Sequence, residues 1–304
     1  MYNEIEYINN LRIDIVNSEE YNNGRRIKLL CELLKGFHFI KIVKILIRYL
    51  KIKKLSYHNK KQYTSIKCNN VNYTNKRIVI YSCITGNYDK CLTPLFHADN
   101  IEYVLFTDNP NIKTDYWKIV DINNMKKLEK LSLAEKNRYI KMNPYSLFEN
   151  KYDYAIYIDG NIQVVSEIRK LINCINDHYG ISMHEHRNRN DIYNEYKVCK
   201  LLNKGNKEYL EKQIAHYKRK KFPKNYGMLE ANVFAVDLKN QSAKVIMSDW
   251  YKEFENSKSG RDQISLPYIL WHNHIEIKDI ATMGSDVYRN PIFYINSHER
   301  GEKK

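Results

Sequence analysis

The sequence lacks several patterns that would place it in a common class of protein. Its six cysteines form no CxxC pair and no zinc-ligand spacing, so a zinc module is not indicated, and we expect buried, reduced thiols as in a reducing cytoplasm. It has no run of about 18 uncharged apolar residues, so no transmembrane helix is expected. Its polar, acidic start does not resemble a signal peptide. These absences predict a cytoplasmic location.

The sequence also has no repeat of fixed period and no recognisable nucleic-acid-binding motif. Its formal charge is +15. Residues 24–61 hold twelve Lys or Arg and one acid (net +11), and residues 197–224 hold ten against two acids (net +8), so the rest of the chain sums to −4. Two local blocks of this kind favour a membrane surface or an anionic ligand over nucleic acid.

The pattern of residues 24–55 is typical of an amphipathic helix. Lys41, Lys44, Arg48 and Lys51 recur at steps of three and four, and an apolar stripe follows the same spacing. Such a helix could lie in an anionic membrane interface. Alternatively, it could pack on the rest of the protein with its lysines facing solvent.

We expect two parts in the chain. Residues 1–70 would form a helical, basic extension and linker, with the polar linker over 56–76, and residues 71–304 would form the main domain. In the main domain, short β-branched runs alternate with turn residues and helical patterns, which predicts a Rossmann-like α/β sheet flanked by helices. The expected strands are 77–86, 101–108, 117–122, 154–159 and 228–238, and the expected helical stretches are 128–148 (with a kink or break at Pro144), 192–220, 242–257 and 262–273.

Three of these strands end in polar residues that favour loops, at 85–87, 107–109 and 159–161. Ligands of such sheets bind beyond the carboxyl ends of the strands, so we expect the site along this edge. Asp159 and Asn161 are separated by one glycine, and residues i and i+2 share one side of an extended chain, so both could bind Mg²⁺ or Mn²⁺ through oxygen. The same triplet is also a common turn or helix cap.

Seven stretches along residues 77–298 carry a recognisable pattern. They are ITGNYD (84–89), FTDN (106–109), EKNRYIKMNPYSLF (135–148), YDYAIYIDGNI (152–162), HRNRNDIYNE (186–195), YGMLEANVFAVD (226–237) and GRDQISLPY (260–268). In this order they resemble the glycosyltransferase-like domain of the plant mucilage and pollen-turgor proteins and their bacterial relatives, long catalogued as a domain of unknown function. An arginine on a helix followed by Y-D-x-x-x-Y-x-D also resembles GT-A glycosyltransferases of the glycogenin and galactosyltransferase type. The resemblance implies a GT-A-like mixed sheet flanked by helices.

The resemblance implies a nucleotide-sugar donor held by one loop, one strand end and one helix. The loop would cradle the base and ribose, the strand end would lie near the base, and cations on the helix could offset the charge of the diphosphate. The implied donor-binding residues are Thr85, Gly86, Asn87, Tyr88 and Asp89 in the loop, Asp108 at the strand end, and Arg138 and Lys141 on the helix.

In the same resemblance, Asp159 and Asn161 take the place of a metal-binding Asp-x-Asp that would hold Mn²⁺ or Mg²⁺. The asparagine is a departure, because a neutral amide is a weaker cation ligand than a carboxylate. Either metal dependence is weakened, or a later histidine completes the site with Asp159. His298 is the metal-ligand candidate, and His186 is a second candidate that would otherwise contact the acceptor.

Two carboxylates are the candidate catalytic groups, Asp262 and Glu230. A transferase needs a carboxylate either to deprotonate the acceptor hydroxyl or to stabilise oxocarbenium-like charge. Asp262 precedes an apolar helix, so it could also be a helix N-cap. Glu230 lies inside an apolar strand, where an unpaired carboxylate would be costly, so we expect it to be paired or functional.

The acceptor side is expected to involve His186, Arg189 and Gln263, with Tyr193 and Glu195 nearby. The basic stretch 197–224 could line a cleft for an anionic acceptor, or it could be a solvated helix face.

The leading hypothesis is a cytoplasmic, GT-A-like glycosyltransferase, peripheral on the inner face of the cell membrane. It would move a hexose from a UDP-sugar to a surface-polysaccharide or glycolipid acceptor. The alternative is a nucleotide-sugar-binding or scaffold protein that has lost catalysis, with Asn161 as the sign of that loss. Nucleic-acid binding is the weakest hypothesis.

Overall fold

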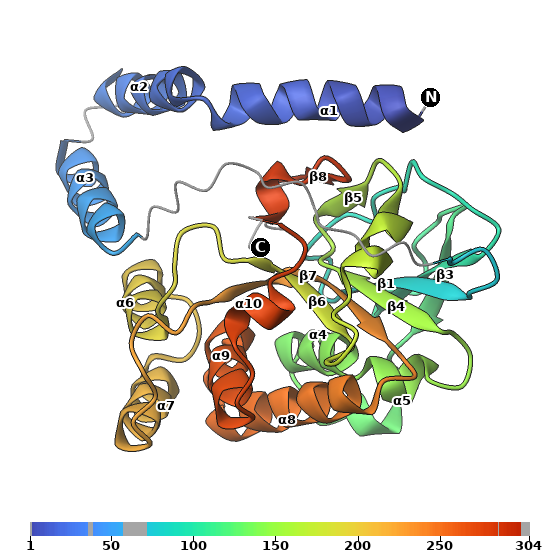
Figure 1. Cartoon of the computed structure of the whole chain (residues 1–304). Helices are drawn as coiled ribbons and strands as arrows, with labels where there is room; N and C mark the ends of the chain where they lie inside the picture. The colour runs from blue at the N-terminus through green and yellow to red at the C-terminus, as the bar shows by residue number, and fades with distance from the viewer. Residues whose placement is uncertain (1, 36–38, 57–71, 285, 299–304) are drawn as a thin grey trace.

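The computed structural model describes residues 2–35, 39–56, 72–284 and 286–298. Most of the expected 56–76 linker therefore lies outside the described residues. The chain forms a central sheet, helices on one of its faces, a small two-stranded sheet on the other, and three helices at the N-terminus (Figure 1).

The central sheet has six strands in the order β3-β2-β1-β4-β7-β6. The first four strands in this order run parallel, whereas β7 is antiparallel to both of its neighbours. The five strands expected from sequence all form, and the structure confirms the predicted mixed α/β sheet flanked by helices. The strands are β1 (Ile78–Ile84), β2 (Ile101–Thr107), β3 (Trp117–Asp121), β4 (Tyr154–Ile158), β6 (Ile181–Glu185) and β7 (Leu229–Asp237).

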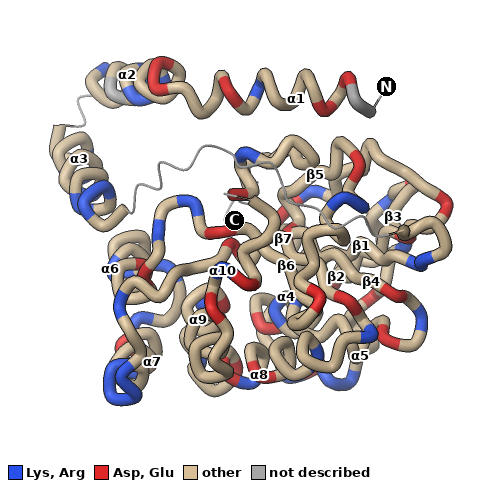
Figure 2. Tube along the Cα trace, viewed as in Figure 1, with Lys and Arg blue, Asp and Glu red and all other residues tan. Residues whose placement is uncertain are grey.

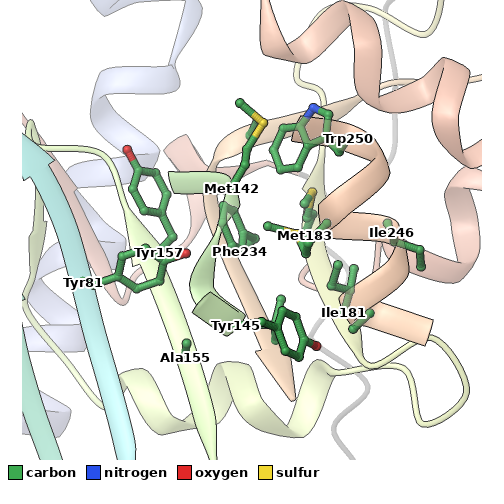
Figure 3. Close-up of a cluster of buried hydrophobic side chains, with 14 of the residues drawn as sticks. Tyr81, Met142, Tyr145, Ala155, Tyr157, Ile181, Met183, Phe234, Ile246 and Trp250 are labelled. Carbon is green, nitrogen blue, oxygen red and sulfur yellow. The ribbon is translucent and has the colours of Figure 1, made fainter. Parts of the chain in front are cut away.

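One face of the sheet packs against four helices over a core rich in aromatic rings. Alternate residues of a strand point to opposite faces, so Tyr81, Tyr157 and Phe234 from three neighbouring strands meet on this side (Figure 3). Tyr157 and Phe234 stack at a centroid distance of 5.2 Å, and Trp250 closes the cluster from a helix. The helices are α4 (Leu133–Met142), α5 (Pro144–Phe148), α8 (Gln241–Ser257) and α9 (Asp262–His272).

The expected helix over 128–148 is interrupted twice. Ser132 and Glu135 form a capping box that starts α4, because Ser132 bonds the Glu135 N–H and Glu135 bonds back to Ser132. Pro144 begins α5, where its missing N–H costs nothing, so the predicted break at this proline is confirmed. The preceding segment contains only the short 3-10 helix η1 (Lys126–Leu128).

The other face of the sheet is covered by the C-terminal part of the chain and by the segment that follows β4. Strand β5 (Ile162–Val164) pairs antiparallel with β8 (Phe293–Ile295). The 3-10 helices η2 (Ile168–Cys174) and η3 (Val287–Arg289) fill the remaining space with apolar side chains, and the short helix α10 (Ile277–Ile280) follows α9.

The second basic block forms two helices, α6 (Ile192–Leu202) and α7 (Lys207–Arg219), rather than one. Asn203 adopts a left-handed backbone that ends α6, and the Asn206 side chain caps α7. All ten Lys and Arg of residues 197–224 are exposed. The exposure of these cations fits a solvated face, and the alternative that they line an acceptor cleft stays a prediction.

The N-terminal extension consists of α1 (Tyr2–Asn17), α2 (Glu19–Lys35) and α3 (Phe39–Lys54). Figure 1 shows α1 lying along the β5–β8 side of the domain. Helix α3 differs, because none of its residues is buried. It contacts the domain at α6 and leaves most of its side chains exposed, so packing on the domain and binding at a membrane surface both stay open. No helix in the described part of the chain is both long and apolar enough to cross a membrane.

The expectation of buried thiols holds for part of the described chain. Cys83, Cys174 and Cys199 are buried and free, and Cys91 is half-buried. Cys31, on α2, is free but exposed, so for this residue the expectation was wrong.

Candidate active site

The polar strand ends meet at one edge of the sheet, as the sequence predicts. Strands β1 and β2 are parallel neighbours with Ile84 opposite Thr107, so the loops that follow them lie side by side. Both carboxylate oxygens of Asp108 accept the Gly86 N–H, at 2.9 and 3.0 Å. Asp159 follows β4 on the other side of β1. The three loops therefore form one continuous polar edge.

The 85–89 loop is held in a defined shape by its neighbours. Gly86 and Asn87 both have a positive φ, of 62° and 51°, which makes a tight left-handed turn. The Thr85 hydroxyl donates to the Leu133 carbonyl at 3.0 Å, which ties the loop to the start of α4. Asp108 fixes the backbone of this loop through the Gly86 N–H. The Tyr88 side chain is exposed to solvent.

The turn after β4 lies directly against this loop. A Cβ added to Gly160 would come within 2.7 Å of Ile84 Cγ1 and 3.1 Å of Asp89 Oδ2, so a larger residue here would displace Ile84 and crowd Asp89. Asp89 Oδ1 lies 2.9 Å from His298 Nδ1, and the His298 ring contacts the Tyr88 ring at 5.1 Å between centroids. The structure thus brings the later histidine to the predicted edge.

Helix α4 directs two cations toward this edge, and we name the resulting group the Lys141 cluster: Arg138, Lys141, Asp159 and Asp262. Lys141 Nζ lies 2.7 Å from Asp262 Oδ2 and 3.8 Å from Asp159 Oδ1. Arg138 Nε lies 3.3 Å from the same Asp262 oxygen. Arg138 and Lys141 are three residues apart, so they share one face of the helix.

The charges of this cluster control the ionisation of Asp262. Burial alone would raise the pKa of its carboxyl group, but Arg138 and Lys141 outweigh burial and hold that pKa well below its usual range. Burial opposes the charge of Arg138 too, yet the Asp262 carboxylate keeps the pKa of the guanidinium raised. Asp262 is therefore a permanent counter-ion at neutral pH.

The structure corrects one alternative for Asp262. Arg261 occupies the N-cap position of α9, and Asp262 is the first residue inside the helix, so the helix N-cap reading was wrong. Its carboxylate is only 2% exposed and faces two cations. This environment favours a charge-pairing role, and the catalytic role of Asp262 stays a prediction.

Asp159 is the more accessible carboxylate of the cluster. Its side chain is 31% exposed. It accepts a hydrogen bond of 2.8 Å from the Tyr157 hydroxyl at Oδ1, so its other oxygen is available to a ligand. Tyr157 was not predicted as a site residue. Its position two residues before Asp159, on the same side of the strand, was the sequence signal that could have found it.

The predicted metal ligands do not form a complete metal site. The side-chain N–H of Asn161 donates a hydrogen bond of 2.8 Å to the Asn296 carbonyl, so Oδ1 is the side-chain atom of Asn161 that could bind a cation. His298 faces Asp89 rather than Asp159. Across the described residues, no three His, Cys, Asp or Glu side chains gather to hold a metal. The donor set present therefore does not fit a preformed divalent-cation site.

The second polar group lies around Glu230, and we name it the Glu230 cluster: His186, Arg187, Glu230 and Gln263. Glu230 Oε1 accepts the backbone N–H of Arg187 at 3.0 Å, and Gln263 donates to Oε2 at 3.3 Å. His186 Nδ1 lies 3.7 Å from Oε1. The expectation that Glu230 is paired is confirmed, and its partners are neutral donors and one histidine.

Other predicted acceptor residues are engaged within the fold. Arg189 Nε donates to Glu195 Oε2 at 2.6 Å, and Arg261 reaches the same carboxylate from α9. Burial would raise the pKa of Glu195, but Arg189 and the neighbouring cations lower it. Tyr193 donates its hydroxyl to the Phe222 carbonyl. Arg189 and Tyr193 therefore hold α6 in place beside the Glu230 cluster.

A comparison with protein families assigns the chain to a family. A model of the TOD1/MUCI70 glycosyltransferase-like domain matches residues 52–298. The chain belongs to this family. The match confirms the resemblance stated from the sequence motifs and supports a transferase acting on sugars. It begins in the last turn of α3, so α1, α2 and most of α3 lie outside the TOD1/MUCI70 domain.

Two further comparisons add little to the TOD1/MUCI70 assignment. No curated protein matches the chain. Among solved structures, the apo structure of the WbbM bifunctional glycosyltransferase is similar at 13% sequence identity and a TM-score of 0.43. That alignment covers 68% of this chain and 39% of the other, so this chain spans well under half of the WbbM structure.

Proposed function

We propose that this TOD1/MUCI70 protein moves a hexose from a nucleotide diphosphate sugar, a UDP-sugar, to a surface-polysaccharide or glycolipid acceptor. The observation that carries the proposal is the meeting of the 85–89 loop, Asp159 and the cationic face of α4 at one edge of the sheet. Ligands of sheets of this type bind at that edge.

In this proposal, the 85–89 loop holds the nucleotide and Arg138 faces its diphosphate. The Arg138 side chain is 26% exposed, whereas that of Lys141 is 3% exposed, so Arg138 is the cation of the cluster that a phosphate can reach. A planar guanidinium suits paired contacts to phosphate oxygens. Lys141 contributes by holding Asp159 and Asp262 at fixed positions.

Glu230 is the proposed carboxylate for the acceptor hydroxyl. A backbone N–H and a side-chain amide hold it, and no lysine or arginine side chain pairs with it among the described residues. Mn²⁺ or Mg²⁺ stays a prediction, with Asp159 and Asn161 Oδ1 as its protein ligands, and no step proposed here depends on it.

Hydrolysis of a panel of UDP-sugars by the full chain, with and without Mn²⁺, tests the transferase proposal. We expect release of UDP from at least one sugar, and Asp159→Ala should abolish it. Glu211→Ala, an exposed carboxylate on α7, is the matched control and should retain the activity. A folded protein that neither binds nor hydrolyses any donor would refute the proposal.

The alternative function is a binding or scaffold protein without catalysis, which the neutral Asn161 favours. Asn161→Asp separates the two functions. If the wild type binds UDP without turnover and this substitution creates turnover, the scaffold function is supported. If the wild type already turns over donor, the scaffold function is excluded.

We further propose that α3 places the enzyme on the inner face of the cell membrane. The helix exposes an apolar stripe that includes Ile40, Val43 and Leu50, with Ile40 75% exposed. Lys and Arg lie beside this stripe and recur along α2 and α3 (Figure 2). Exposed apolar side chains flanked by cations suit an anionic lipid surface.

Flotation with lipid vesicles tests this location. Replacing Lys41, Lys44 and Arg48 with Gln should weaken binding to phosphatidylcholine vesicles that contain about one-third phosphatidylglycerol by roughly a hundredfold, at about 1 kcal/mol per cation. The same replacement of three exposed lysines on α7 is the control, and it should change binding little. Equal losses from both sets would show only a general charge effect.

A further inference from the structure

Tyr288 lies against Arg187 of the Glu230 cluster, and neither residue was predicted as a site residue from sequence. The guanidinium carbon of Arg187 lies over the Tyr288 ring, 5.2 Å from its centroid. The backbone N–H of the same Arg187 donates to Glu230. Tyr288 is 40% exposed, so part of its surface is open beside the proposed acceptor carboxylate.

Charges from both polar clusters act on the Tyr288 phenol. Burial raises the pKa of its phenol to about 12, and the Glu230 carboxylate is the largest charge that acts in the same direction. Asp159 also raises this pKa, whereas Arg187 lowers it. The phenol is therefore within electrostatic reach of Asp159 on the donor side and of Glu230 on the acceptor side.

Helix α1 holds the segment that carries Tyr288. The buried Asn9 side chain donates to the Pro291 and Phe293 carbonyls, at 2.7 and 2.9 Å. Arg12 stacks over the Tyr294 ring at 4.3 Å. These contacts lie just after η3, so α1 fixes the chain on the C-terminal side of Tyr288, as Figure 1 shows for α1 and β8.

The same helix also reaches Arg187. Its last residue, Asn17, accepts a hydrogen bond from the Arg187 guanidinium through Oδ1. A continuous set of contacts therefore runs from Asn17 through Arg187 to the Tyr288 ring and to Glu230. Because Asn17 lies outside the family match, this connection is a feature of the N-terminal extension added to the TOD1/MUCI70 domain.

We propose that Tyr288 forms a sugar-binding surface of the acceptor site, and that Asn17 of α1 is a positioning residue that holds Arg187 against it. An aromatic ring offers an apolar face to the C–H groups of a pyranose, and a nearby carboxylate and guanidinium can bind its hydroxyl groups. The expected acceptor end is therefore a neutral pyranose. The inference rests on the proposed transferase function.

The test uses the full chain and methyl glycosides of glucose, galactose, mannose and rhamnose as acceptor probes. Saturation-transfer NMR measures their binding directly, and transfer from the active UDP-sugar measures KM and kcat. Tyr288→Ala should raise the acceptor KM about tenfold or abolish the NMR signal, as expected for loss of a ring contact. Tyr116→Ala, a tyrosine of similar exposure away from the site, should change neither.

The positioning role of Asn17 predicts a smaller effect of the same kind. Asn17→Ala should raise the acceptor KM about threefold with little change in kcat, as expected for one lost hydrogen bond. Asn10→Ala, an exposed residue of the same helix, should leave KM unchanged. A fall in kcat with an unchanged KM would overturn the positioning role.

The outcomes separate this inference from the transferase proposal. Glycoside binding that depends on Tyr288 in a protein without donor turnover would support the sugar surface and refute the transferase. Donor turnover with no glycoside binding, or with binding that Tyr288→Ala does not change, would overturn the sugar surface alone. Failure of both assays in a folded protein would overturn both proposals.

Discussion

The Lys141 cluster and the Glu230 cluster both centre on buried carboxylates, but they hold them in opposite ways. In the Lys141 cluster, Arg138 and Lys141 pair with the buried carboxylate of Asp262, so each buried charge is stabilised by its partners. In the second, a backbone N–H and an amide hold Glu230. Removing one member of a buried ion pair leaves an uncompensated charge, whereas a carboxylate held by neutral donors can lose its charge at a smaller cost. The first cluster should therefore govern stability and the second activity.

The largest effect should come from removing the shared counter-ion of the first cluster. Asp262→Ala leaves Lys141 and Arg138 beside each other without the carboxylate that both contact. We expect a loss of about 3–5 kcal/mol in the free energy of unfolding, measured by urea denaturation. Asp249→Ala removes a partly exposed pair on α8 and should cost less than about 1 kcal/mol. Similar losses in both variants would show that burial does not make the ion pairs of Asp262 more important for stability than an exposed pair.

Neutralising Glu230 should reduce activity and leave stability almost unchanged, the reverse of the effect expected for Asp262→Ala. Glu230→Gln keeps the shape of the side chain and an oxygen that can accept the Arg187 N–H. We expect transfer to fall at least about a hundredfold, as for loss of a general base, with a melting temperature close to that of the wild type. Activity is measured by UDP release in the presence of acceptor. An active Glu230→Gln enzyme would remove this residue from the chemistry.

Several parts of this comparison could be predicted from sequence and others could not. The strand ends converge as predicted, because parallel neighbouring strands must bring their carboxyl ends to one edge. The pairing of Lys141 with Asp262 was not predictable, since 121 residues separate them and no local pattern records the contact. Tyr288 was missed for the same reason.

Sequence periodicity alone could not predict where one helix breaks or how another packs. The stretch 192–220 has continuous helical periodicity, but the left-handed backbone of Asn203 breaks it, and a single asparagine is a weak signal in so asparagine-rich a chain. Helix α1 was expected only as part of a helical extension. It docks through Asn9, a polar residue buried by hydrogen bonds to two carbonyls, together with the buried Ile13, and no local pattern marks Asn9 as a buried residue.

The pH dependence of stability gives a sharper view of the Lys141 cluster. The pKa of Asp262 is lowered in the folded state, so the unfolded chain takes up a proton first as the pH falls below about 4. The stabilisation is therefore complete above that pH and is lost as the pH decreases toward the folded pKa, by at most about 1.4 kcal/mol per pH unit. The difference in unfolding free energy between wild type and Asp262→Asn should shrink from pH 5 to about pH 3. A constant difference would show that the charge of Asp262 is not the stabilising feature.

The smallest effect should come from a substitution beside Asp159, the solvent-accessible carboxylate of the Lys141 cluster. Tyr157→Phe removes the hydroxyl that donates to Asp159 Oδ1 at 2.8 Å. Because the Asp159 side chain is 31% exposed, water can replace that donor, and we expect the donor KM to rise by less than about tenfold. Tyr145→Phe removes a hydroxyl that bonds the Asp237 and Asn240 carbonyls away from the site, so it should leave the donor KM unchanged. A large loss of stability in Tyr157→Phe, comparable with that of Asp262→Ala, would mean that Asp159 belongs to the buried ion-pair system and is not the accessible carboxylate of the cluster.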